Sequence, residues 1–129
     1  MTTVVVDASA LVDALLIDGV ARSRLTTANL HAPELIDAEV LSVIRRLVLA
    51  GKLPEAAGMR ALETVSRLGL RRYSTRELWP RAWELRANLS AYNALYVALA
   101  ERLDAPLVTT DAKAARAPGL GCAVEVLAL

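Results

Sequence analysis

Short continuous apolar runs alternate along this chain with longer stretches in which apolar residues recur every three or four positions. Residues 3–6 form a continuous β-branched run, which is typical of a buried strand. Further candidate strands are residues 70–73, 107–109 and 123–127, and the break at 31–33 follows a candidate short extended segment. The helical stretches are residues 10–17, 34–50, 53–68, 77–88, 91–103 and 111–116. Because strands and helices alternate and no hairpin turn separates two strands, the pattern predicts an α/β fold with a central, mainly parallel sheet and helices on both faces.

Two helix starts carry recognisable capping residues. Ser90 is expected to cap the helix over 91–103. Ser74-Thr-Arg-Glu77 resembles a capping box for a helix that runs to Asn88, provided that Pro80 lies in its first turn.

The composition limits the class of protein. A chain of 129 residues with 55% apolar residues is long enough for one domain, residues 1–129, with a sizeable core. No apolar stretch is long enough to span a bilayer, and Asp7 and Asp13 interrupt the first apolar run, so no secretory signal is expected. The single Cys122 excludes an internal disulfide and suits a reducing cytosol, so we expect a cytoplasmic protein. The net charge of +1 does not indicate a strongly basic nucleic-acid binder.

Four polar side chains stand where predicted strands end or predicted helices begin: Asp7, Glu39, Asn93 and Asp111. In a parallel α/β sheet, the carboxyl ends of the strands and the starts of the following helices share one edge, where ligands bind. Three carboxylates and one amide gathered there would hold a hard divalent cation through oxygen. The pattern therefore points to metal-assisted phosphodiester chemistry.

Each of the four also has a purely structural explanation. Asp7 and Asp111 are suited to cap helices, Glu39 to interact with a helix dipole, and Asn93 to bond the cap at Ser90. If each of these four residues had only its own structural role, their position at one edge of the sheet would be a coincidence. We therefore favour a common site.

The ordered set of motifs resembles PIN-domain proteins, and more narrowly the VapC toxins of bacterial toxin–antitoxin pairs. The motifs are Asp7-Ala-Ser9-Ala-Leu, Pro33…Glu39-Val-Leu…Arg45-Arg46-Leu, Tyr92-Asn93-Ala-Leu-Tyr-Val-Ala-Leu-Ala and Leu107-Val-Thr109-Thr-Asp111, and they extend over nearly the whole chain. The resemblance implies a three-layer PIN-like domain and an endoribonuclease that depends on Mg²⁺ or Mn²⁺. It implies that the four site residues are catalytic and metal-binding, with Ser9 and Thr109 as supporting hydroxyl residues.

One position departs from the family pattern, which has Asp where this chain has Asn93. Asn keeps the shape and one oxygen acceptor but loses the negative charge, so we expect weaker metal binding and reduced or abolished activity. One explanation is an inactivated variant of a toxic protein, which the single conservative change in an otherwise intact motif favours. The other is a natural Asn, with activity reduced or supported by Asp7, Glu39 and Asp111.

Contacts with RNA are expected at positions around the acidic edge. Lys113 and Arg116 lie closest in sequence to Asp111 and are the foremost candidates for phosphate contacts, and Tyr92 is placed to stack on a base. Lower-ranked candidates are Arg22, Arg24, Arg45, Arg46, Arg81 and Arg86.

Protein partners are suggested by apolar positions on two helices. Trp79 and Trp83 either pack in the core or form a groove for a partner helix. The resemblance implies that this partner is a VapB-like antitoxin whose tail covers the acidic site. The helix over 34–50 has two apolar faces and is suited to a homodimer contact.

Other function classes fit less well. A phosphotransfer receiver domain needs an acceptor Asp in mid-chain, yet none occurs between Asp37 and Asp104, and a haloacid-dehalogenase-like phosphatase would carry Asp where Ser9 stands. One His and one Cys give little support for a zinc site. The main alternative is a non-catalytic PIN-like RNA- or protein-binding module made inert by Asn93, and metal affinity distinguishes it from the enzyme.

Overall fold

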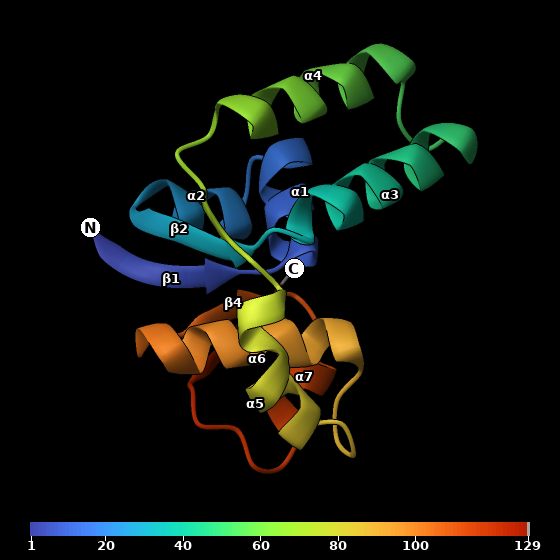
Figure 1. The fold of residues 1–129 in the computed structure, drawn as a ribbon. Coiled ribbons are helices and arrows are strands. Elements are labelled where there is room, and N and C mark those ends of the chain that lie inside the picture. The colour runs from blue at the N-terminus through green and yellow to red at the C-terminus, as the bar shows by residue number, and fades with distance from the viewer. Residues whose placement is uncertain (129) are drawn as a thin grey trace.

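Five parallel strands form one sheet in the order β3-β2-β1-β4-β5 (Figure 1). The structure is a computed structural model that describes residues 1–128. The strands are β1 (Thr2–Val6), β2 (Ala28–Pro33), β3 (Arg71–Tyr73), β4 (Leu107–Thr109) and β5 (Val124–Val126). Every neighbouring pair runs parallel, which confirms the predicted kind of sheet.

Helices cover both faces of the sheet and complete a three-layer α/β fold. They are α1 (Ala8–Leu16), α2 (Val20–Thr26), α3 (Ile36–Leu49), α4 (Glu55–Arg67), the 3₁₀ turn η1 (Arg76–Leu78), α5 (Trp79–Glu84), α6 (Ala91–Leu103) and α7 (Ala112–Arg116). In Figure 1, α1 to α4 lie on one side of the strands and α5 to α7 on the other. None of the helices in residues 1–128 is long and apolar enough to cross a membrane.

The central strand β1 explains the continuous apolar run near the N-terminus. Val4, Val5 and Val6 are fully buried because helices pack on both faces of the strand. On one face lies α6, whose residues 96–100 are also buried. This core fixes the ends of β1 and β4 as neighbours, with Val6 opposite Val108.

Three local predictions need correction. Helix α2 was not predicted, and residues 31–33 belong to the strand β2 rather than forming a break after it. The Ser74–Glu77 capping box does not form: no side chain caps η1 or α5, and α5 ends at Glu84 instead of Asn88. The helix α5 begins at Trp79, which places Pro80 in its first turn. At that position the missing backbone N–H of proline is tolerated.

Candidate active site

The strand order reverses at the carboxyl ends of β1 and β4. From β1 the chain moves outward through β2 and β3, then returns to add β4 on the other side of β1. Such a switch point leaves a crevice beyond the strand ends. Asp7 follows β1 there, and Asp111 follows β4 two residues after Thr109.

A cleft of about 520 Å³ opens at this point, and all four predicted site residues line it. Asp7 and Asp111 come from the two strand ends, Glu39 from the first turn of α3 and Asn93 from the first turn of α6. Each is half-buried, so each side chain is held by the fold yet can reach a ligand. Residues up to 104 positions apart in sequence therefore share one concave surface.

Hydroxyl groups hold Asp7 in the cleft. Its Oδ1 accepts hydrogen bonds from the Ser9 hydroxyl at 2.7 Å and from the Ala10 backbone N–H at 3.0 Å, so Asp7 also caps α1. Its Oδ2 accepts a short hydrogen bond from the hydroxyl of Thr109, which is fully buried. The side chain of Asp7 thus both caps α1 and lines the cleft, and Ser9 and Thr109 orient its two carboxylate oxygens.

Glu39 is held by a residue that sequence reasoning missed. The hydroxyl of Tyr96 donates a 2.6 Å hydrogen bond to Oε1 of Glu39, and Tyr96 itself is only 2% exposed. Burial raises the pKa of Glu39, the Tyr96 hydrogen bond opposes that rise, and the nearby negative charge of Asp7 adds to it. Burial and the contact with Glu39 also raise the pKa of Tyr96 far above its ordinary value, so Tyr96 stays a proton donor.

Asn93 and Asp111 each combine a helix start with a place in the cleft. The backbone N–H of Asn93 bonds the Ser90 hydroxyl at 3.2 Å, as the expected cap requires, while its side chain lines the cavity. Asp111 accepts a hydrogen bond at 2.9 Å from the backbone N–H of Lys113 and caps α7.

The donor set of the cleft fits a hard divalent cation. Its ligands would be three carboxylates and one amide oxygen, the atoms that Mg²⁺ and Mn²⁺ bind in proteins. None of these carboxylates forms an ion pair with Lys or Arg in residues 1–128, so the protein leaves their charge unneutralised. Over the same residues, no three His, Cys, Asp or Glu side chains already converge as a metal site. One of the four positions that line the cleft is the amide of Asn93, and Asp111 is engaged in its helix cap, so the carboxylates share the cleft without forming a ready-made ligand cluster.

The predicted RNA contacts divide into two groups. Tyr92 lines the cleft and is 62% exposed, so its ring is open to a base. Lys113 and Arg116 are exposed on α7 and do not line the cleft, whereas Arg46 on α3 does.

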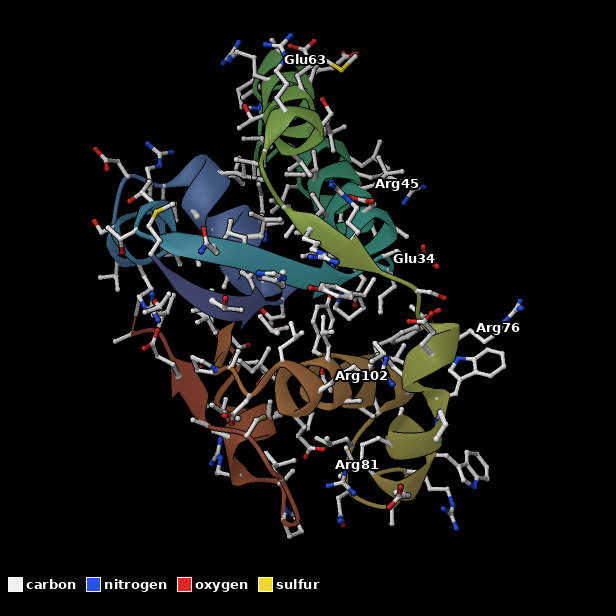
Figure 2. The ribbon with its side chains drawn as sticks, turned by 60° about the vertical axis from the view of Figure 1, so that its left-hand side comes forward. Glu34, Arg45, Glu63, Arg76, Arg81 and Arg102 are labelled. Atoms are coloured by element: carbon white, nitrogen blue, oxygen red, sulfur yellow. The ribbon has the colours of Figure 1, made fainter. Side chains whose placement is uncertain are left out.

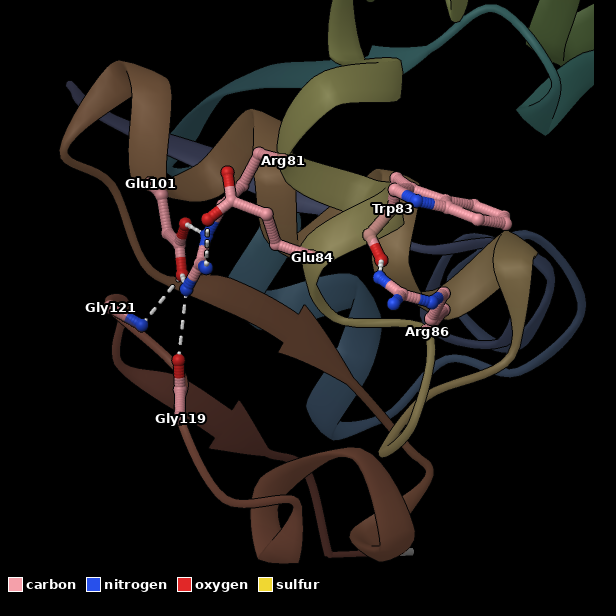
Figure 3. Close-up of polar contacts among 7 residues, drawn as sticks. All are labelled: Arg81, Trp83, Glu84, Arg86, Glu101, Gly119 and Gly121. Atoms are coloured by element: carbon pink, nitrogen blue, oxygen red, sulfur yellow. Dashed lines mark hydrogen bonds and ion pairs between the residues drawn. The ribbon is translucent and has the colours of Figure 1, made fainter.

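Both tryptophans lie on the surface rather than in the core. Trp79 is 58% exposed and Trp83 68% exposed, with the guanidinium of Arg86 stacked 4.6 Å from the Trp83 ring centre. Figure 3 shows Trp83 of α5 beside Arg86, which follows the end of this helix. The core-packing alternative for these two residues is therefore wrong.

Comparisons with known proteins identify the family. The PIN domain model matches residues 4–120. Ribonuclease VapC9 of Mycobacterium tuberculosis is 48% identical over 124 residues, which cover 96% of this chain and 98% of that protein. The structure of VapBC2 from Rickettsia felis, bound to a DNA fragment from its promoter, matches with a TM-score of 0.70 at 16% identity over 98% of both chains. VapBC-5 from Mycobacterium tuberculosis, a member of the VapBC family of toxin–antitoxin systems, matches with a TM-score of 0.64 at 15% identity over 97% of this chain and 98% of that one. The chain therefore belongs to the PIN-domain family, as a VapC-type member.

Proposed function

We propose that the chain is a metal-dependent endoribonuclease and the toxin of a VapBC-type pair. The observation that carries the proposal is the cleft at the switch point, which Asp7, Glu39, Asn93 and Asp111 line from four parts of the chain. The name of the relative VapC9 as a ribonuclease supports RNA as the substrate. In residues 1–128, the single His31 hydrogen-bonds Tyr73 on the sheet, outside the cleft, so a His-based nucleophile mechanism has no support.

The four site residues would hold Mg²⁺ or Mn²⁺. When bound, such an ion stabilises charge on a scissile phosphate and lowers the pKa of a water molecule for attack. The residues of the chain prepare the site: Ser9 and Thr109 fix both oxygens of Asp7, and Tyr96 fixes one oxygen of Glu39. Orientation by such hydrogen bonds keeps the donors near their binding geometry before a ligand arrives.

Asn93 is proposed to weaken this site. An amide offers one neutral oxygen acceptor where a carboxylate would bring a full negative charge. Metal binding and cleavage by this chain are therefore expected to be lower than for the form with Asp at this position.

The partner is proposed to be a VapB-like antitoxin, which the match to VapBC-5 supports. Trp79 and Trp83 offer it an exposed aromatic surface on α5. Exposed Leu41 and Leu49 on α3 are proposed to form a homodimer contact within a larger toxin–antitoxin assembly.

The test compares RNA cleavage by this chain and by Asn93→Asp in Mg²⁺, Mn²⁺ and EDTA. We expect cleavage of cellular RNA by the Asn93→Asp form, abolished by EDTA, and at least about tenfold slower cleavage by the parent chain because the metal site has lost a charged ligand. Isothermal titration with Mn²⁺ should show tighter binding by Asn93→Asp. The double variant Asn93→Asp, Glu39→Gln is the matched control and should not cut.

Two outcomes would decide against the enzyme. If both forms are folded and neither cuts RNA nor binds Mn²⁺, the chain is a non-catalytic PIN-like binding module. If EDTA leaves cleavage unchanged, the activity does not depend on the metal site.

A further inference from the structure

The cleft carries one cationic side chain beside its acidic residues. Arg46 lies on α3, and within residues 1–128 it is the only Lys, Arg or His among the residues that line the cavity. A carboxylate-lined cleft repels a polyanion such as RNA, so a cation at one end of it affects where a strand can lie.

Within residues 1–128, Arg46 also has no side-chain partner in the protein. Four other arginines form ion pairs with carboxylates: Arg24 with Glu125, Arg72 with Asp37, Arg81 with Glu101 and Arg102 with Glu77. In the part of the chain that the structure describes, Arg46 forms neither an ion pair nor a side-chain hydrogen bond, and it is exposed. Its guanidinium is therefore available to a ligand.

The spacing along α3 separates this cation from the acidic end of the cleft. Glu39, Ser42, Val43 and Arg46 all line the cavity, and positions three, four and seven apart share one helix face. Seven residues of helix span about 10 Å. Arg46 therefore attracts an anion without neutralising Glu39. Two different points along one extended RNA strand can contact the two ends of this face of α3, one at Glu39 and the other at Arg46.

A phosphate is the ligand that suits this position. The planar guanidinium donates two parallel hydrogen bonds to phosphate oxygens, which a lysine cannot match. Tyr92, 62% exposed and lining the same cleft, offers a ring on which a base of the strand can stack. Backbone contact and base stacking together are typical of proteins that bind single strands.

We infer that Arg46 binds a phosphate of single-stranded RNA that flanks the one held at the acidic end, so that α3 rather than α7 guides the substrate strand. This inference deepens the proposed nuclease function and rests on it. It replaces Lys113 and Arg116 with Arg46 as the foremost phosphate contact.

Fluorescence anisotropy with a short fluorescein-labelled oligouridylate tests the inference. The parent chain is used in Mg²⁺ over a series of salt concentrations, because Asn93 is expected to keep turnover low. We expect Arg46→Ala to weaken binding about tenfold and to reduce the slope of log affinity against log salt by about 0.7, the value for one contact with a single-stranded phosphate. Arg46→Lys should keep the slope and lose part of the affinity.

Two charge-matched variants serve as controls. Arg45→Ala removes a charge from the same helix, where Figure 2 shows the Arg45 side chain extending outward from α3. Lys113→Ala removes the charge next to Asp111 on α7, outside the cleft. Both should bind oligouridylate as the parent does, and circular dichroism should show that all variants are folded.

Several results would overturn the inference: no binding of oligouridylate by the parent, no effect of Arg46→Ala, or equal losses in Arg46→Ala and Arg45→Ala. Polyglutamate that binds as tightly as the RNA, with the same dependence on Arg46, would assign Arg46 to an acidic protein segment instead. Failure of the nuclease proposal would appear separately, as absent cleavage by Asn93→Asp while the Arg46 dependence of binding persists.

Discussion

Tyr96 shows how one buried hydroxyl determines the position of a candidate metal ligand. It engages Oε1 of Glu39 and leaves the second carboxylate oxygen of that residue without a side-chain partner in residues 1–128. Because the ring of Tyr96 is almost fully buried, the hydroxyl has little freedom to move. Glu39 is therefore presented to the cleft through one oxygen in a fixed direction.

Replacing Tyr96 with Phe should loosen Glu39 while keeping the core filled. In the Asn93→Asp form, we expect Tyr96→Phe to weaken Mn²⁺ binding about tenfold, the usual cost of losing a partner that orients a metal ligand. Isothermal titration measures this affinity. Tyr73→Phe, which removes the 2.7 Å contact with His31 outside the cleft, is the control and should bind Mn²⁺ normally. Equal losses of Mn²⁺ affinity in Tyr96→Phe and Tyr73→Phe would contradict a specific role of Tyr96, because they would show a general effect of tyrosine hydroxyls on the fold.

At the scale of elements, one ion-pair network joins α5, α6 and the loop before β5. Arg81 of α5 donates from Nε and Nη2 to Glu101 of α6 at 2.6 and 3.1 Å, and also to the Gly119 carbonyl at 2.9 Å. The backbone N–H of Gly121 donates to the same carboxylate at 2.6 Å, as Figure 3 shows. Glu101 thereby connects three segments that meet on the α5–α7 side of the sheet.

The network gives stability a defined pH dependence. The hydrogen bond from Arg81 holds the pKa of Glu101 below its ordinary value of 4.5, burial opposes this, and the Gly121 N–H adds to it. A carboxyl group with a lowered pKa stabilises the fold fully above its ordinary pKa, and this contribution is lost as the pH falls through the lowered value. Glu101→Gln should therefore cost about 1–2 kcal/mol at neutral pH and progressively less in acid. Urea unfolding of both forms over a pH series measures the difference, and a gap that widens in acid would contradict the assignment. The control is Asp104→Asn, which removes the charge of an exposed carboxylate next to α6.

Elements with their own local signals could be predicted from the sequence, and elements without them could not. Helix α6 matches its predicted bounds because Ser90 caps its start and Asp104, in the left-handed region at φ 50°, ends it. Helix α2 has only seven residues, and Gly19 supplies no side-chain cap, so its pattern does not differ from that of a loop. Strand β2 ends in a proline, which weakens a strand prediction, although β2 lies inside the sheet between β3 and β1.

The same distinction holds in the site. Asp7, Glu39, Asn93 and Asp111 could be predicted because each stands at a strand end or helix start, and the fold brings such positions together. Tyr96 could not, because its partner Glu39 lies 57 residues away and an apolar helix position gives no sign of a hydroxyl contact. Arg46 was only one of eight basic candidates, because the sequence alone does not say which helix face turns to the cleft.

The whole molecule has apolar surface left over after its core is formed. Leu41 is 53% exposed and Leu49 69% exposed on α3, and the two tryptophans of α5 add to this surface. Exposed apolar patches of this kind mark sites where proteins associate.

Charge placed on this surface should prevent the proposed homodimer. We expect the parent chain to sediment as a dimer and Leu41→Glu, combined with Leu49→Glu, to sediment as a monomer, because burying two unpaired carboxylates costs several kcal/mol. The control is Glu63→Lys on α4, which changes the sign of an exposed charge but replaces no apolar side chain. This variant should leave the dimer intact. A monomeric parent chain at micromolar concentration would contradict the homodimer proposal.

The order of the strands also determines when, during synthesis, the cleft can exist. Asp7 emerges from the ribosome first, but the strand that stands beside it, β4, lies at residues 107–109, and Asp111 follows. Until that late segment emerges, β1 lacks a neighbour on one side and the acidic set lacks a member. A nascent chain truncated before β4 therefore lacks Asp111 and the complete cleft. The central position of an early strand thus delays completion of the cleft until most of the protein has been made.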